Sequence, residues 1–186
     1  MDRAMPACNV AAQQAKGEST MTLRMALAVM FLASGTALAA GSGDLDYVLA
    51  ASLPPGIADA FAGKPRYVFE ARLNPFYLHG DFDGDGWRDT VILLKEKATG
   101  KSGYGFVLKR GRVAVVGAGT PIDGMGDDFS ALDAWHVEPR GKVLQGASDE
   151  SPPKIKGDAL MVIKTESASG LIYWNGKRFR WYQQGD

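Results

Sequence analysis

Four aspartates lie within nine residues of one short segment, which reads D-F-D-G-D-G-W-R-D from residue 81 to residue 89. They are Asp81, Asp83, Asp85 and Asp89. Unpaired carboxylates about 5 Å apart repel each other by about 1 kcal/mol per pair in water, and by more where water is partly excluded. A divalent cation among them reverses the sign of this energy. The spacing therefore predicts a metal-binding loop.

The composition of this loop also indicates which ion it would hold. Gly84 and Gly86 allow the backbone to curl through positive φ, which brings carbonyl groups close to the ion. The loop has neither thiol nor imidazole, so Zn²⁺ and Cu²⁺ are disfavoured, and a flexible shell of carboxylates suits Ca²⁺ better than the strict octahedron of Mg²⁺. We expect the four aspartates to bind Ca²⁺ through their side chains, and Trp87 to bind it through its backbone carbonyl.

The flanking residues distinguish this loop from an EF-hand. The twelfth loop position of an EF-hand is an acid that binds through both oxygens, but here it is Ile92. Pro75 and Gly80 disfavour a helix before the loop, and the apolar, mostly β-branched run at 90–94 predicts a strand after it. The expected arrangement is strand, calcium loop, strand.

With its flanks, the segment from residue 80 to residue 94 reads G-D-F-D-G-D-G-W-R-D-T-V-I-L-L. It resembles the FG-GAP, or VCBS-like, repeat of integrin α-subunit propellers and many bacterial secreted proteins, whose calcium loops follow D-x-D-G-D-G-x-x-D. The resemblance implies that the same four aspartates bind Ca²⁺. A closed propeller needs several blades of about 40 to 50 residues each, and this chain has one such loop, so it is too short for a closed propeller.

The chain after residue 66 carries the signals of short strands. Runs of β-prone residues separated by turn-forming residues occupy 67–69, 76–78, 90–94, 104–108 and 113–116. Residues 109–112 predict one hairpin, and the Asn-Gly pair within 174–177 predicts another with a type I′ turn. In the last strand Phe179 and Trp181 fall on one face and Arg178, Arg180 and Tyr182 on the other, as expected when only one face packs on a core. Longer surface loops are expected at 121–133 and 146–157.

Two short helices are expected before these strands, at 45–51 and 56–62. The fold class predicted is mainly β, with antiparallel sheets of short strands, hairpins and a short helical N-terminal segment. We divide the chain into residues 40–65, a linker with short helices, and residues 66–186, a single β-rich domain.

The N-terminal residues predict export. An apolar run at 25–33 follows Arg24 and precedes small residues that end at Ala39, which is the pattern of a signal peptide cleaved after Ala39. The run is too short for a permanent membrane anchor. Met21 is a more ordinary start than Met1, so residues 1–20 are a candidate untranslated stretch within the predicted signal peptide at 1–39. The expected location is periplasmic or secreted.

Composition excludes several function classes. The 21 basic and 21 acidic residues balance, which argues against a polybasic nucleic-acid binder. The only cysteine, Cys8, precedes the apolar run, so the exported chain has no thiol for a disulfide, a nucleophile or a thiolate metal site. The sequence contains no G-x-S-x-G motif, so nothing in it indicates a serine hydrolase. The two histidines, His79 and His136, do not have the sequence spacing of a metal-binding motif such as H-x-x-x-H.

The leading hypothesis is an exported calcium-binding β domain, not an enzyme, that acts as an interaction module with a structural Ca²⁺ loop. Its partner would be a protein or glycan of the envelope or extracellular space. One alternative is a periplasmic inhibitor or immunity-type protein that blocks an envelope hydrolase. A lesser alternative is a metal-assisted hydrolase that uses His79. The acidic stretch at 123–128 has the composition of a second ion loop without its spacing.

Overall fold

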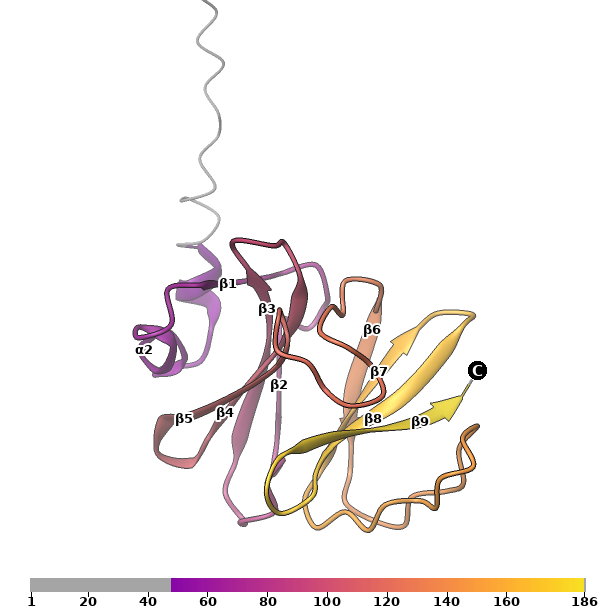
Figure 1. Cartoon of the computed structure of the whole chain (residues 1–186). Helices are drawn as coiled ribbons and strands as arrows, with labels where there is room; N and C mark the ends of the chain where they lie inside the picture. The colour runs from indigo at the N-terminus through magenta and orange to yellow at the C-terminus, as the bar shows by residue number, and fades with distance from the viewer. Residues whose placement is uncertain (1–47, 186) are drawn as a thin grey trace, which may run out of the picture. The chain divides into compact units, whose positions relative to one another are not determined.

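The computed structural model describes residues 48–185, and these residues are mainly β. Two antiparallel sheets of short strands make up this part of the chain, preceded by short helical segments (Figure 1). The predicted fold class is therefore confirmed. The predicted signal peptide lies outside the described residues. None of the helices described between residues 48 and 185 has the length and hydrophobicity that a membrane-spanning helix requires.

The first sheet is built around its longest strand, β3. Its strands are β1 (Tyr67–Phe69), β2 (Tyr77–Gly80), β3 (Asp89–Glu96), β4 (Ser102–Leu108) and β5 (Arg112–Gly117). The order is β1-β3-β4-β5, and β2 also pairs with β3. Phe69 is opposite Leu94 and Tyr77 is opposite Ile92, so β1 and β2 follow one another along the same edge of β3. This register places the acidic segment in the turn that joins β2 to β3.

Both faces of β3 are covered, which explains its continuous apolar sequence. Val91 and Leu93 face the second sheet, whereas Ile92 and Leu94 pack with the helices. The helical residues are 48–52 and α2 (Ile57–Phe61), the latter close to the helix predicted at 56–62. A strand buried on both sides needs no polar alternation.

The second sheet contains β6 (Ala134–Glu138), β7 (Ala159–Lys164), β8 (Ala168–Trp174) and β9 (Phe179–Gly185), paired in that order. The predicted hairpin between β8 and β9 is present, but the prediction of a type I′ turn is wrong. Gly176 has φ 94°, whereas Asn175 is not among the residues with positive φ. Instead, the Asn175 side-chain oxygen accepts the amide hydrogens of Lys177 and Arg178, at 2.9 Å each.

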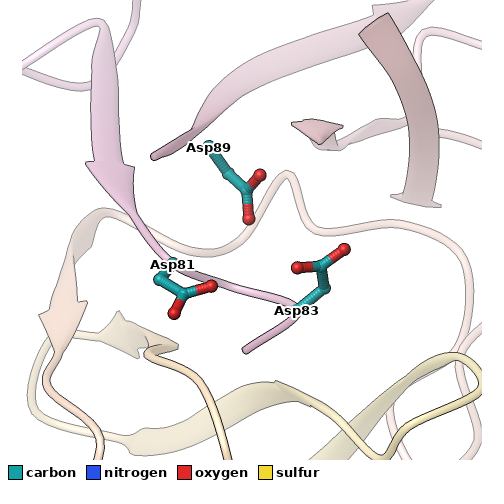
Figure 2. A group of neighbouring side chains, drawn as sticks. All are labelled: Asp81, Asp83 and Asp89. Carbon is teal, nitrogen blue, oxygen red and sulfur yellow. The ribbon is translucent and has the colours of Figure 1, made fainter. Parts of the chain in front are cut away.

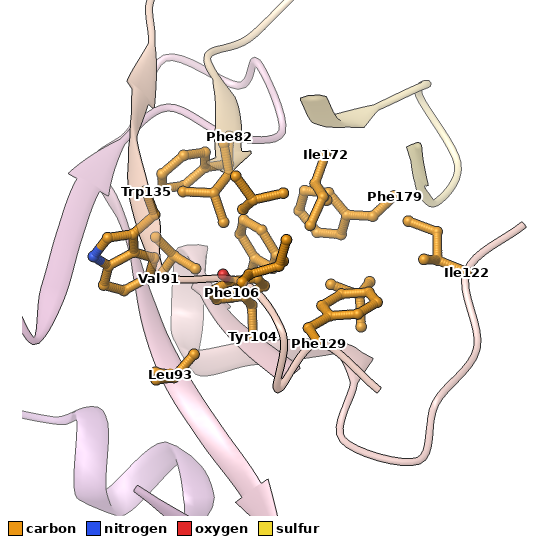
Figure 3. Packing of buried hydrophobic residues seen from close by; sticks show 14 of the residues in the cluster. Phe82, Val91, Leu93, Tyr104, Phe106, Ile122, Phe129, Trp135, Ile172 and Phe179 are labelled. Atoms are coloured by element: carbon orange, nitrogen blue, oxygen red, sulfur yellow. The ribbon is translucent and has the colours of Figure 1, made fainter. Parts of the chain in front are cut away.

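The largest cluster of buried side chains lies between the two sheets (Figure 3). Aromatic rings from opposite sheets stack there: Tyr104 on Trp135, with centroids 5.4 Å apart, and Phe106 on Phe179, at 4.0 Å. Because this core takes side chains from both sheets, neither sheet can keep its inner face buried alone.

Residues 139–158 contain no strand, but they cover apolar side chains on the other face of the second sheet. Val143 and Ile155 from this segment pack with Leu171 and Tyr182 of the sheet. The Gly146 amide donates a hydrogen bond of 2.9 Å to the Tyr182 hydroxyl, and Tyr182 is only 2% exposed. The prediction that the last strand packs on one face only is therefore wrong, because this segment supplies a second, smaller core.

Candidate metal centre

The acidic loop closes the β2–β3 hairpin. Gly80 pairs with Asp89, so Asp81 directly follows β2 while Asp89 begins β3, and the two carboxylates start from adjacent strands. Gly84 and Gly86 have φ values of 73° and 84°, which confirms the predicted backbone curl. These conformations turn the intervening backbone back towards the strand ends.

Three of the four predicted aspartates converge. Asp81, Asp83 and Asp89 each contribute a carboxylate oxygen to a group in which these atoms all lie within 4.8 Å of one another. Figure 2 shows their carboxyl groups directed towards a common space. The side chains of Asp81 and Asp83 are 8% and 5% exposed, and Asp89 as a residue is 1% exposed. Three acids are thus held together in a place where water screens them poorly.

Hydrogen bonds use only part of this carboxylate capacity. Asp81 Oδ2 accepts the Gly86 amide hydrogen at 3.1 Å, and Asp89 Oδ2 accepts that of Phe82 at 2.9 Å. The other oxygens, Asp81 Oδ1 and Asp89 Oδ1, are buried and have no hydrogen-bond partner. An unpaired buried carboxylate oxygen is costly, and a bound cation is one of the few groups that satisfies two of them at once.

The pKa of Asp89 shows the same conflict between burial and charge. Burial, and after it the nearby negative charge of Asp83, raise this pKa from 3.8 to about 6, against the backbone amide of Phe82, which lowers it. Without a cation, ionising Asp89 therefore costs free energy in the folded chain. A dication in the cluster would offset that cost.

The other two predicted ligand residues, Asp85 and Trp87, lie at the outer end of the loop. Asp85 is exposed and does not belong to the three-carboxylate group; its Oδ1 accepts the Trp87 amide hydrogen at 2.9 Å, and its Oδ2 lies 4.0 Å from Lys109 Nζ. The Trp87 ring is on the surface, 59% exposed, and Lys109 Nζ lies 4.3 Å from its centroid. The Lys109 ammonium group therefore faces both residues at the outer end of the loop.

Three residues from distant parts of the chain complete the surroundings of the loop. Arg112 Nη2 lies 2.5 Å from Asp83 Oδ2, and Arg140 Nη2 lies 3.4 Å from Asp81 Oδ2. Asp158 accepts the Asp81 amide hydrogen at 2.8 Å and donates its own amide hydrogen to the Asp81 carbonyl at 2.7 Å. Sequence reasoning missed all three, because no short-range spacing relates them to the loop.

Neither histidine is a member of the three-carboxylate group, although His79 contacts the backbone of Asp89. His79 Nδ1 lies 3.0 Å from Thr90 Oγ1 and 3.3 Å from the Asp89 carbonyl, and burial lowers its pKa. His136 is exposed, with Nε2 3.7 Å from a Glu138 carboxylate oxygen. Neither imidazole belongs to the group of converging ligand atoms.

The acids of the 123–128 stretch already have partners in the fold. Asp123 Oδ2 accepts hydrogen bonds from Arg178 and Arg180, Asp127 pairs with Lys101 at 2.6 Å, and Asp128 Oδ1 accepts two backbone amide hydrogens. Within residues 48–185 they do not form a group of converging metal ligands.

Comparison with protein-family models, with characterised proteins and with solved structures finds no match to this chain. The geometry of the acidic loop and its surroundings is therefore what indicates the function of this chain.

Proposed function

We propose that this protein is a calcium-binding β domain in which the ion is structural. The observation that carries the proposal is the pair of buried, unpartnered oxygens of Asp81 and Asp89, which lie beside Asp83 in one group. Oxygen donors alone select a hard cation, and a multi-carboxylate loop suits Ca²⁺. Asp85 and the Trp87 carbonyl are proposed as further ligands from the loop sequence.

The proposed ion would act as a cross-link. It would join the end of β2 to the start of β3 through Asp81 and Asp89, at the place where Asp158 also binds the loop backbone. A ligand that binds only the folded chain stabilises it, and here the gain includes relief of three crowded carboxylates.

We further propose that the domain is an exported interaction module whose partner is a protein or glycan outside the cytoplasm. The support is the expected signal peptide together with large apolar side chains left exposed around the domain: Phe76 at 40%, Trp87 at 59% and Leu144 at 70%. Trp87 lies on the loop itself, so an ordered loop would present it in a fixed position.

Isothermal titration calorimetry of the purified chain with Ca²⁺ and with Mg²⁺ tests the site. We expect saturable binding of Ca²⁺ with a Kd at or below the range of about 10⁻⁴ to 10⁻³ M typical of extracellular modules, and weaker binding of Mg²⁺. Asp89→Asn should abolish binding. Asp149→Asn, which removes an exposed acid far along the sequence from the loop, is the matched control and should leave it unchanged. Absence of saturable heat at millimolar Ca²⁺ would contradict the proposal.

A further inference from the structure

Two arginine side chains contact proposed ligand carboxylates, so a bound dication would compete with them for the same oxygens. We infer that Arg112 and Arg140 are built-in counter-cations, which hold the carboxylates together without the ion and lower the affinity of the site for it. This inference deepens the proposed function and rests on it. It assigns control of affinity to residues from two separate segments outside the loop.

Arg112 is the stronger of the two contacts. It begins β5, and its Nη2 lies 2.5 Å from Oδ2 of Asp83, whose side chain is only 5% exposed. The Arg112 side chain is itself 60% exposed, and its guanidinium carbon lies 5.8 Å from the Trp174 ring centroid. One end of the ion pair is therefore fixed and buried, whereas the other reaches in from solvent. Such a side chain can leave the carboxylate without disturbing the core.

Arg140 approaches the second carboxylate from the segment at 139–158. Its Nη2 lies 3.4 Å from Asp81 Oδ2, and its side chain is 58% exposed. Its backbone amide donates a hydrogen bond of 3.0 Å to Asp158, so the main chain stays anchored if the guanidinium moves away. The movable part of each contact is thus a long, exposed side chain.

Electrostatics fixes the sign of the effect. A guanidinium within hydrogen-bond distance of a ligand carboxylate either repels an incoming dication or must be displaced by it, and both lower the affinity. Exposed ion pairs have modest energies, and a buried carboxylate partner strengthens them, so removing either arginine charge should tighten Ca²⁺ binding by roughly three- to tenfold. A purely structural role, in which the arginine orients the carboxylate, predicts weaker binding instead.

Calorimetric Ca²⁺ titrations of four single variants test this inference. Arg112→Gln and Arg140→Gln remove the two charges. Arg112→Lys retains a positive charge, and Arg178→Gln removes one from the exposed contact with Asp123, which is not part of the cluster. We expect the Kd for Ca²⁺ to fall in Arg112→Gln and Arg140→Gln and to stay unchanged in the other two variants. In the double Gln variant the two fold-changes should multiply, because the two arginines contact different carboxylates.

The outcomes separate this inference from the function on which it rests. If the wild-type chain binds Ca²⁺ but either Gln variant binds it no more tightly, the counter-cation role of that arginine is overturned while the site stands. If Arg178→Gln tightens binding as much as Arg112→Gln, the effect is one of net charge and the inference fails. If no variant binds Ca²⁺ at millimolar concentration, both proposals fail. Binding by the Gln variants alone would support the counter-cation role of the arginines but contradict Ca²⁺ binding by the wild-type chain.

Discussion

Asp89 is the residue where burial and negative charge conflict most directly. It is 1% exposed, one of its oxygens has no partner, and its pKa is raised to about 6. In the ion-free chain the protonated form is favoured by folding, so the contribution of Asp89 to stability is greatest below its unfolded pKa near 3.8 and is lost as the pH rises through about 6. The charged form of Asp89 stabilises the folded chain only when a cation is bound beside it.

Replacing Asp89 with Asn should therefore have opposite effects with and without Ca²⁺. In EDTA at pH 7 the variant should be more stable than the wild type, by up to about 3 kcal/mol, because Asn needs no ionisation and its side-chain oxygen can still accept the Phe82 amide hydrogen. With saturating Ca²⁺ only the wild type should gain stability. Urea unfolding of both proteins under both conditions measures this. A variant less stable than the wild type in EDTA would contradict it.

The loop sequence predicted much of this site and could not predict the rest. The alternating aspartates and the two glycines were enough to predict that Asp81, Asp83 and Asp89 lie together, because a short curled loop brings such residues together whatever surrounds it. Arg112, Arg140 and Asp158 reach the loop only through strand pairing and the path of a long segment. Contacts over such sequence separations leave no local pattern to find.

At the scale of elements, the contact between the acidic loop and the 139–158 segment is close enough to exclude any side chain. A Cβ atom added at Gly157 would lie 2.3 Å from the Asp81 carbonyl oxygen and 2.6 Å from the Gly84 nitrogen. Both neighbours are backbone atoms, which cannot rotate away. The absence of a side chain at Gly157 is what allows the segment to hydrogen-bond to the loop through the next residue, Asp158.

Gly157→Ala should push this segment away from the loop. We expect a loss of stability of about 1–3 kcal/mol, typical of overpacking, and weaker Ca²⁺ binding because Asp81 loses its support. Gly141→Ala is a matched control in the same segment, since its added Cβ would meet nothing nearer than 3.9 Å. Thermal unfolding and Ca²⁺ titration of the two variants provide the test. Equal behaviour of the two would show that the close contact is unimportant.

The sheets themselves illustrate which elements a sequence specifies. The apolar run at 90–94 lies within β3 as predicted, because its residues suit a strand covered on both faces. The 146–157 stretch, rich in polar residues, predicted only a surface loop, yet it belongs to a segment that buries Tyr182. Its few apolar side chains have no periodicity, so their burial depends on a sheet elsewhere in the chain.

At the scale of the described domain, the two sheets share one core, and the acidic loop adjoins both. Phe82, within the loop, is fully buried in that core and contacts Phe106 edge to face at 5.2 Å. Phe106 in turn stacks on Phe179 of the second sheet. A change in the loop is therefore transmitted to residues that both sheets need for their inner faces.

The ion should consequently stabilise the domain as a whole and not the loop alone. At a Ca²⁺ concentration about 100 times Kd the gain is about 2.7 kcal/mol, which is roughly a hundredfold slower exchange for amides that open only by global unfolding. Hydrogen exchange should show this slowing for the most protected amides of β3 and, equally, of β7, which has no residue in the cluster. The Asp89→Asn variant should show no slowing in either strand. Protection gained only between residues 81 and 90 would mean that the loop and the shared core unfold independently, and would refute the role of the ion as a cross-link of the fold.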